Sequence, residues 1–281
     1  MSIFMSLFLG IVQGIAEFLP ISSSGHLALI QNIFSSYVEE EHMLFDVLLH
    51  FGTLISICAV YRKEIKAMIS DSLTFLRMRS DSDVDEPVIM RPPARALLFV
   101  IIGTIPMVIA FIFRKSVSRL FYYNGFIGFA LIITGGLLYI SDKYIPKGKK
   151  TEKTMTISDA IIIGLAQAVA SLPGLSRSGA TLSVGLARGM SGSFAVRFSL
   201  LLSIPAVFAA TVVTIFSAIR SGMNFSLLPI YLAGFIVATV VGFFTIQLLR
   251  RLINKGGLSK FAYYCWGIGL VTMILSLIIR N

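Results

Sequence analysis

The stretch QGIAEFLPISSSGH, residues 13–26, interrupts an apolar run with a proline, three serines and a glycine. Apolar residues continue on both sides of it, from Met1 to Ile33. Each half of this run is near or below the roughly 20 apolar residues that a helix needs to span a bilayer. Irregular backbone at membrane depth persists only where it is buried in protein or lines a water-filled cavity. The pattern therefore predicts a re-entrant helical hairpin over Met1–Ile33.

A second apolar stretch, Ile157–Gly189, is broken in the same way by Pro173-Gly174 and the run Ser176 to Gly179. At an offset of 154 residues the two stretches share six identities in sixteen positions, on Gly10, Gln13, Ala16, Ser22, Ser24 and Gly25. Interrupted apolar segments in corresponding halves mark the midplane site of inverted-repeat membrane folds. We therefore expect one membrane domain over residues 1–281, with repeats at about 1–140 and 157–281.

The composition of the whole chain indicates a membrane protein. Of the 281 residues, 56% are hydrophobic and only 14% charged, against roughly 25% charged in soluble domains. This excludes a disordered chain and an ordinary soluble enzyme, and two cysteines in apolar runs exclude a disulfide scaffold. The expected class is all-α integral membrane, with two re-entrant hairpins and six transmembrane helices: Leu44–Tyr61, Ala96–Phe113, Leu120–Ile140, Phe194–Ile219, Leu227–Leu249 and Phe261–Ile279.

The formal net charge of +10 is mostly an orientation signal. Sixteen of the 24 Lys and Arg residues lie in three loops, Arg62–Arg95, Ser141–Thr156 and Arg250–Lys260. Basic loops favour the cytoplasmic side, so both termini are expected outside and the hairpins should come from opposite faces. The first loop is interpreted as a solvated connector with an amphipathic helix over Lys63–Phe75 and an acidic run from Asp81 to Glu86. The first basic residue is Arg62, so no cleavable signal peptide is expected.

Few charges remain inside apolar sequence, and Glu17 is one of them. Placing a charged residue at the centre of a membrane helix costs about 2.5–3.5 kcal/mol. A charged residue found there therefore usually forms an ion pair or has a role in function. Glu17 lies four residues after Gln13, on the same helix face. The two side chains suit a divalent cation such as Mg²⁺ or Ca²⁺, or a base and its hydrogen-bond partner. The alternative is a carboxylate at a helix end near the membrane interface.

The second elbow, Pro173–Thr181, has the components of a phosphate cradle. Glycines permit close backbone approach, the hydroxyls can hydrogen-bond, and the following helix offers its free N–H groups. Arg177 adds a bidentate fork that suits phosphate oxygens. The pattern indicates an anionic ligand, although a tight turn alone would explain the glycines.

In the first elbow, Ser23 is a candidate nucleophile, with Glu17 or His26 as the base that takes its proton. Asp46 and His50 are four residues apart at the start of a predicted span and are interpreted as a helix-start pair. Arg188 and Arg197 are interpreted as interface anchors.

The strings QGIAEFLPISSSGH (13–26) and PGLSRSGAT (173–181) resemble the two signature motifs of bacterial undecaprenyl-diphosphatase, the bacitracin-resistance family, and the resemblance extends over essentially the whole chain. It implies a membrane phosphatase that converts undecaprenyl diphosphate to the monophosphate lipid carrier of peptidoglycan synthesis, with a dependence on Mg²⁺ or Ca²⁺. The family's functional residues map onto Glu17, Ser23, His26, Ser176, Arg177 and Thr181. Many relatives have Glu where this chain has Gln13, which removes one anionic metal ligand.

Together these patterns predict a complete site. The expected catalytic residues are Glu17, Ser23, His26 and Arg177, the phosphate-binding residues are Ser22, Ser24, Gly25, Ser176, Ser178, Gly179 and Thr181, and the metal ligands are Gln13 and Glu17. The expected partners are a polyprenyl diphosphate and membrane lipids, with no nucleic acid and with a homodimer left open. The expected location is the bacterial cell membrane, with the site facing outward.

Several alternatives stay open at the level of sequence. Water could attack phosphorus directly, with Ser23 only donating a hydrogen bond, and the roles of Glu17 and His26 could be exchanged. A transporter of isoprenoid phosphates would also use broken helices at the midplane. A structural membrane subunit would leave Glu17 and Arg177 unexplained.

Overall fold

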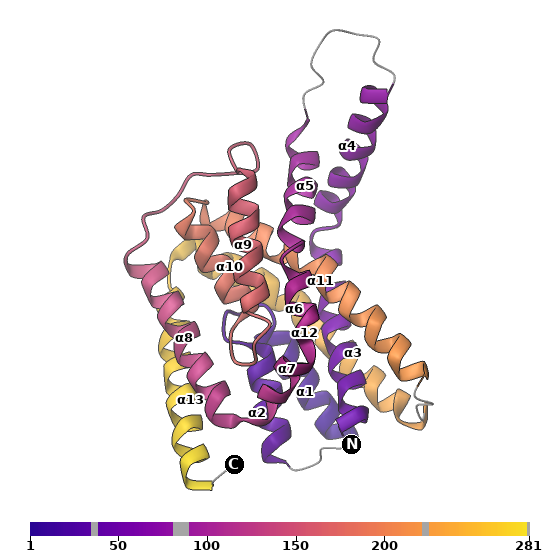
Figure 1. Cartoon of the computed structure of the whole chain (residues 1–281), viewed down its shortest axis with the longest axis vertical. Coiled ribbons are helices and arrows are strands. Elements are labelled where there is room, and N and C mark those ends of the chain that lie inside the picture. Colours follow the sequence, from indigo (N-terminus) through magenta and orange to yellow (C-terminus); the bar gives the residue numbers. More distant parts are fainter. Residues whose placement is uncertain (35–38, 81–89, 221–224, 280–281) are drawn as a thin grey trace.

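The computed structural model describes residues 1–34, 39–80, 90–220 and 225–279, and these parts of the chain are helical, with short turns between the helices (Figure 1). The elements are α1 (Ile3–Ala16), α2 (Ser23–Ile33), α3 (Glu39–Val60), α4 (Arg62–Ser80), α5 (Pro92–Thr104), α6 (Met107–Ile112), α7 (Arg114–Arg119), η1 (Leu120–Tyr122), α8 (Asn124–Lys143), α9 (Ile157–Val169), α10 (Arg177–Ala187), α11 (Gly192–Arg220), η2 (Phe225–Leu227), α12 (Leu228–Lys255) and α13 (Leu258–Ile279). Within these described ranges no strand forms. The acidic run predicted from Asp81 to Glu86 lies outside them.

Five helical segments are long and apolar enough to cross a bilayer, which confirms an all-α, multi-pass membrane protein. They are Pro92–Ile112, Asn124–Lys143, Gly192–Arg220, Leu228–Ile253 and Leu258–Ile278. A sixth crossing requires Leu44–Val60 together with Arg62–Arg79, and this pair is bent by 75°. The bend separates an apolar half from a charged half. The predicted count of six therefore holds only if this bent pair is one span.

Two predicted segments differ from the observed helices. The span expected over Ala96–Phe113 is divided, because α5 ends at Thr104 and α6 begins at Met107. Pro106 lies between them and has no N–H to donate to the preceding turn, so the helix breaks there. The amphipathic helix expected over Lys63–Phe75 runs further, to Ser80, and lies along α5 (Figure 1).

The two interrupted stretches form the expected helical hairpins. The first consists of α1 and α2, and the second of α9 and α10 (Figure 1). In Figure 1 the hairpins come from opposite ends of the bundle, and their elbows meet near its centre. The Ser178 hydroxyl of the second elbow donates a hydrogen bond to the Leu19 carbonyl of the first (3.3 Å), so the elbows are in direct contact.

The second hairpin is anchored where α9 begins. Asp159 is fully buried and forms ion pairs with Lys150 (3.0 Å) and Arg188 (2.7 Å). Its carboxylate also accepts a hydrogen bond from the Thr156 N–H, while the Thr156 hydroxyl accepts one from the Asp159 N–H. This capping box satisfies two of the free N–H groups at the start of the helix. The predicted interface anchor Arg188 therefore holds the hairpin in place.

Both hairpins pack closely against another helix through glycine. A side chain at Gly10 of α1 would meet the Gly234 carbonyl of α12 at 2.6 Å. At Gly164 of α9, the residue that matches Gly10 at the offset of 154, a side chain would clash with the Gly103 carbonyl of α5. Small residues at such positions let membrane helices approach closely. The matched glycines thus allow each hairpin to pack closely against its neighbouring helix.

The Gly10 contact predicts a large effect of a side chain at that position. Gly10→Val should lower the free energy of unfolding by about 1–3 kcal/mol, because its Cβ cannot avoid the α12 backbone. The control is Gly136→Ala in α8, where an added Cβ meets no atom within 4 Å. Its effect should stay within about 1 kcal/mol. Both values follow from denaturant unfolding in detergent micelles, and equal stabilities of the two variants would contradict the tight packing.

Candidate active site

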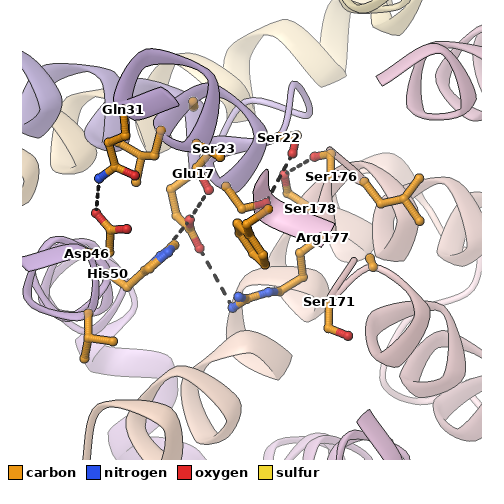
Figure 2. A pocket seen from close by; sticks show the side chains of 18 of the residues that line it. Glu17, Ser22, Ser23, Gln31, Asp46, His50, Ser171, Ser176, Arg177 and Ser178 are labelled. Carbon is orange, nitrogen blue, oxygen red and sulfur yellow. Dashed lines mark hydrogen bonds and ion pairs between the residues drawn. The ribbon is translucent and has the colours of Figure 1, made fainter. Parts of the chain in front are cut away.

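A cavity of about 390 Å³ lies where the two elbows meet (Figure 2). Its wall contains residues 22–24 and 176–178 of the two elbows, the end of α1, residues 46–50 of α3 and the segment that precedes α8. Glu17, Asp46, His50 and Arg177 are the ionisable residues of this wall. The cavity therefore collects most of the costly polar groups that the apolar sequence contains.

Each elbow ends in a serine that caps the next helix. The Ser22 hydroxyl accepts a hydrogen bond from the Gly25 N–H (3.2 Å), and the Ser176 hydroxyl accepts one from the Gly179 N–H (3.0 Å). These caps are matched by the repeat, and they begin α2 and α10 at the cavity. The remaining N–H groups of both first turns make the two helix N-termini favourable for an anion.

The first elbow stores backbone strain at Ser22. Its φ of 71° lies in the left-handed region that favours glycine, and Ser22 is the one non-glycine residue of the described chain there. Such a conformation costs on the order of 1–3 kcal/mol and is usual at functional sites. In this conformation the Ser22 hydroxyl caps α2 by accepting from the Gly25 N–H, and Ser23 lines the cavity.

The second elbow is held by Thr134 of α8. The Thr134 hydroxyl donates to the Gly174 carbonyl (3.2 Å) and accepts from the Ser176 N–H (3.1 Å). Gly174 has a φ of 89°, and a side chain there would collide with the Ile127 carbonyl. Thr134 thus hydrogen-bonds the Gly174 carbonyl and the Ser176 N–H, two backbone groups to which lipid offers no hydrogen-bond partner.

Glu17 is the centre of the polar network (Figure 2). Its Oε2 atom accepts hydrogen bonds from the Ser23 hydroxyl (2.6 Å) and the Gln13 amide (3.0 Å). The His50 Nδ1 atom lies 3.1 Å from the same oxygen and 2.7 Å from the Gln13 Nε2 atom. A nucleophile candidate, a carboxylate and an imidazole are therefore linked in one chain of contacts.

Arg177 approaches this network from the other hairpin. Its Nη1 atom lies 3.9 Å from Glu17 Oε1 and makes no hydrogen bond within the described residues. The side chain is 29% exposed and lines the cavity, while the Nη1 atom itself is buried. An arginine held near a carboxylate with unused donors is suited to take a second, multiply charged anion.

The predicted site residues divide into two groups. Glu17, Ser22, Ser23, Ser24, Ser176, Arg177 and Ser178 line the cavity, and Gln13 contacts Glu17 directly. His26, Gly25, Gly179 and Thr181 do not line it. The two glycines supply the capped N–H groups, and Thr181 is buried against Ser199 and its own helix.

His26 faces α13 instead of the cavity. Its Nδ1 atom contacts the Ser22 carbonyl oxygen and its Nε2 atom contacts the Tyr264 hydroxyl, both at 2.8 Å. The two rings are stacked with their centroids 5.6 Å apart. Both ring nitrogens of His26 are thus engaged in holding the first elbow.

His50, and not His26, lies beside Glu17. The sequence alone did not predict His50 as a site residue. The pattern of Asp46 and His50 indicated only a helix-start pair. Asp46 does bond elsewhere, accepting from Gln31 (2.7 Å), while His50 is turned toward α1. The available signal was a histidine in apolar sequence, but its partner is 33 residues away and no local spacing identifies it.

Gln13 and Glu17 fit a divalent cation that takes its other ligands from a phosphate. The Gln13 Oε1 atom is buried and has no hydrogen-bond partner among the described residues. Mg²⁺ is often held by one or two protein oxygens together with substrate phosphates and water. The described residues contain no group of three His, Cys, Asp or Glu side chains that could hold a metal alone.

Comparison with known proteins identifies the family to which the chain is similar. The sequence matches the family of the bacitracin resistance protein BacA over residues 6–271. An undecaprenyl-diphosphatase of Carboxydothermus hydrogenoformans is 38% identical over 98% of both chains. One from Methanosphaera stadtmanae is 36% identical over 99% of this chain and all of the relative. One from Treponema denticola is 40% identical over 96% of both chains.

The Thr134 contacts predict how the second elbow is stabilised. Thr134→Val keeps the shape of the side chain but leaves the buried Ser176 N–H and Gly174 carbonyl unpaired, which should cost about 1–3 kcal/mol of unfolding free energy. Thr104→Val is the matched control, since the Thr104 hydroxyl donates to the Val100 carbonyl of its own helix (2.7 Å) and bonds no other group of the described residues. The control should lose about 1 kcal/mol or less. If denaturant unfolding gave the same loss for both variants, the role of Thr134 would be wrong.

Proposed function

The chain belongs to the bacitracin resistance protein BacA family, and from this membership we propose that it hydrolyses undecaprenyl diphosphate to undecaprenyl phosphate and inorganic phosphate. The observation that carries the proposal is the convergence of Ser23, Glu17 and Arg177 at one cavity between two helix N-termini. A serine hydrogen-bonded to a carboxylate is an activated nucleophile, and an arginine beside it supplies positive charge for phosphoryl oxygens.

The diphosphate binds between the elbows. Its oxygens accept hydrogen bonds from the Arg177 guanidinium and from the N–H groups and serine hydroxyls of the first turns of α2 and α10. The polyprenyl chain lies in lipid between helices. Apolar residues of the cavity wall, among them Leu27, Phe121 and Leu175, suit this placement.

In the first step the Ser23 oxygen attacks the terminal phosphorus, and the bond from that phosphorus to the bridging oxygen breaks. The Ser23 proton passes to Glu17 Oε2, which already accepts its hydrogen bond at 2.6 Å. Undecaprenyl phosphate leaves, and water then cleaves the phosphoserine to regenerate Ser23 and release phosphate. Arg177 and the helix N-termini balance the charge that spreads over the phosphoryl oxygens.

The geometry favours Glu17 over His26 as the proton acceptor. Glu17 contacts Ser23, whereas both ring nitrogens of His26 are occupied by Ser22 and Tyr264. His50 and Gln13 hold the Glu17 carboxylate in place from the opposite side. His26 then acts by positioning the first elbow and with it Ser23.

A divalent cation, Mg²⁺ or Ca²⁺, would be held by Glu17 and Gln13 together with the diphosphate. When bound, it supplies positive charge to the phosphoryl oxygens. Gln13 offers a neutral oxygen, so this chain depends on the substrate for most of the negative charge around the cation.

In the cell this reaction would recycle the lipid carrier of peptidoglycan synthesis and confer resistance to bacitracin. The enzyme would lie in the cell membrane with its cavity open to the outer face. The three basic loops support this orientation, because they belong to the opposite ends of the helices that form the cavity.

The proposed role of Arg177 predicts a large loss of turnover on its removal. Arg177→Ala should lower kcat/KM for phosphate release from a polyprenyl diphosphate by about 100-fold or more, because the transition-state charge loses its main counterion. Arg177→Lys should recover part of the rate, since a lysine keeps the charge but not the fork. The measurement is phosphate release by the purified protein in detergent with Mg²⁺.

The control is Arg251→Gln, an exposed basic residue outside the cavity, which should keep full activity. A chelator should lower the rate, and added Mg²⁺ or Ca²⁺ should restore it. If the folded wild type released no phosphate, the phosphatase proposal would be wrong, and lipid movement by the same protein would favour a transporter. Full activity of Arg177→Ala would refute only the phosphate cradle.

A separate prediction concerns the nucleophile. Ser23→Ala should lower kcat by about 100-fold or more, and rapid acid quenching of the wild type should trap a phosphoserine at position 23. The matched control is Ser171→Ala, since Ser171 lines the same cavity but donates to the Ala168 carbonyl (2.7 Å). Its rate should change by no more than about two-fold. A fully active Ser23→Ala would instead establish direct attack by water.

A further inference from the structure

A second cavity, of about 500 Å³, lies at the other end of α3. Asp46 near the start of α3 lines the first cavity, while Tyr61, directly after this helix, lines the second. Fifteen helical residues separate these positions by about 22 Å. The second cavity is therefore close to the opposite membrane face and contains none of the groups proposed to react.

Two arginines of this cavity are each held against an aromatic ring. The Arg197 guanidinium lies 5.3 Å from the Phe194 ring centroid, and the Arg250 guanidinium lies 5.7 Å from that of Tyr61. Arg197 also pairs with Glu152 at 2.6 Å. For Arg250, no carboxylate of the described residues lies within ion-pair distance. Aromatic contacts fix the direction of a guanidinium and leave its N–H donors available.

The charge of the lining is positive. Lys153, Arg197 and Arg250 outnumber Glu64 and Glu152, and Glu152 is already paired. With Arg197 and Glu152 paired, Lys153 and Arg250 together outnumber Glu64, so the lining keeps a net positive charge. An anion that entered the cavity would be attracted to Arg250 and to Lys153.

The first turn of α11 forms another part of the wall. Ser191 precedes this 29-residue helix, and its hydroxyl accepts from the Phe194 N–H at 3.4 Å. Ser191 and Ser193 both line the cavity. Hydroxyls and free N–H groups at the positive end of a long helix add to the two arginines as donors for oxygen anions.

The depth of the cavity matches that of lipid head groups. Its wall combines the first turn of the span Gly192–Arg220 with the last turns of the span Leu228–Ile253. The aromatic rings of Tyr61 and Phe194 lie at the same level as the arginines. Basic pockets between helix ends with nearby aromatic residues are the usual binding sites of phospholipid head groups.

We propose that this second cavity binds a phosphate group, contributed by a phospholipid head group of the adjacent leaflet or by a free phosphate ester. The Arg250 guanidinium, the Arg197 guanidinium and the first turn of α11 supply the donors. The proposal is independent of the catalytic proposal, because the two sites share no residue.

The test measures how much phosphatidylglycerol stays bound to the purified full chain by native mass spectrometry. Arg250→Gln should retain about five-fold less than wild type, as expected for the loss of one cation at the membrane surface. Arg251→Gln removes the neighbouring exposed arginine, which does not line the cavity, and should retain the wild-type amount.

Ser193→Glu provides a variant that separates binding from folding. A carboxylate in the first turn of α11 favours the helix, so stability should be kept while the added negative charge repels phosphate. Retained phosphatidylglycerol should again fall about five-fold. Phosphate release by Ser193→Glu and Arg250→Gln should equal that of wild type, which keeps this test apart from the proposed phosphatase activity.

Two further measurements show whether the bound phosphate belongs to a phospholipid head group or to a free phosphate ester. Displacement of the lipid by millimolar inorganic phosphate would support a site for free phosphate esters, and resistance to it would support a head-group site. Diacylglycerol, which has no phosphate, should not be retained. The proposal would be overturned by equal lipid retention in Arg250→Gln, Ser193→Glu and Arg251→Gln, or by equal retention of diacylglycerol.

Discussion

The two elbows place irregular backbone inside an apolar domain, and the rest of the molecule depends on how its N–H and C=O groups are satisfied. In lipid each unpaired group costs several kcal/mol, so an elbow persists only if side chains replace the missing helix bonds. Ser22 and Ser176 cap the helices that follow, and Thr134 bonds both sides of Gly174. The hairpins can therefore end inside the helix bundle, where their elbows meet and a cavity opens.

The same constraint explains the electrostatics of the cavity. Glu17 is only 9% exposed and lies among apolar helices, where an isolated charge would be costly. Three hydrogen-bonding groups gather on one of its oxygens, and Arg177 approaches the other. Since Glu17 and Arg177 belong to different hairpins, the charges are balanced only when both hairpins are inserted. The site and the assembly of the two repeats are thus stabilised by the same contact.

Local signals predicted the hairpins well. Proline, glycine and serine interrupted the apolar runs, and the bounds of α1, α2, α9 and α10 follow those interruptions. Because charged residues are costly in lipid, Glu17 and Arg177 could be predicted as site residues from sequence. In the structure both line the cavity. Local spacing could not place His26 and His50, because the direction of each ring is set by a distant helix. The His26 ring contacts the Tyr264 hydroxyl, on the side away from the cavity. The His50 ring contacts Gln13 and Glu17 and therefore lies at the cavity.

The repeat is symmetric in its scaffold and asymmetric in its chemistry. The cap serines and helix-packing glycines recur at an offset of 154, but Glu17 corresponds to Ser171 and Ser23 corresponds to Arg177. Because both elbows face one cavity, identical residues at these positions would place two carboxylates or two guanidiniums side by side, and like charges repel strongly where water is scarce. Divergence at these two pairs instead gives one hairpin the carboxylate and the candidate nucleophile and the other the cation. A cavity that holds an anion and also activates a hydroxyl requires this difference, whereas the contacts that build the elbows do not.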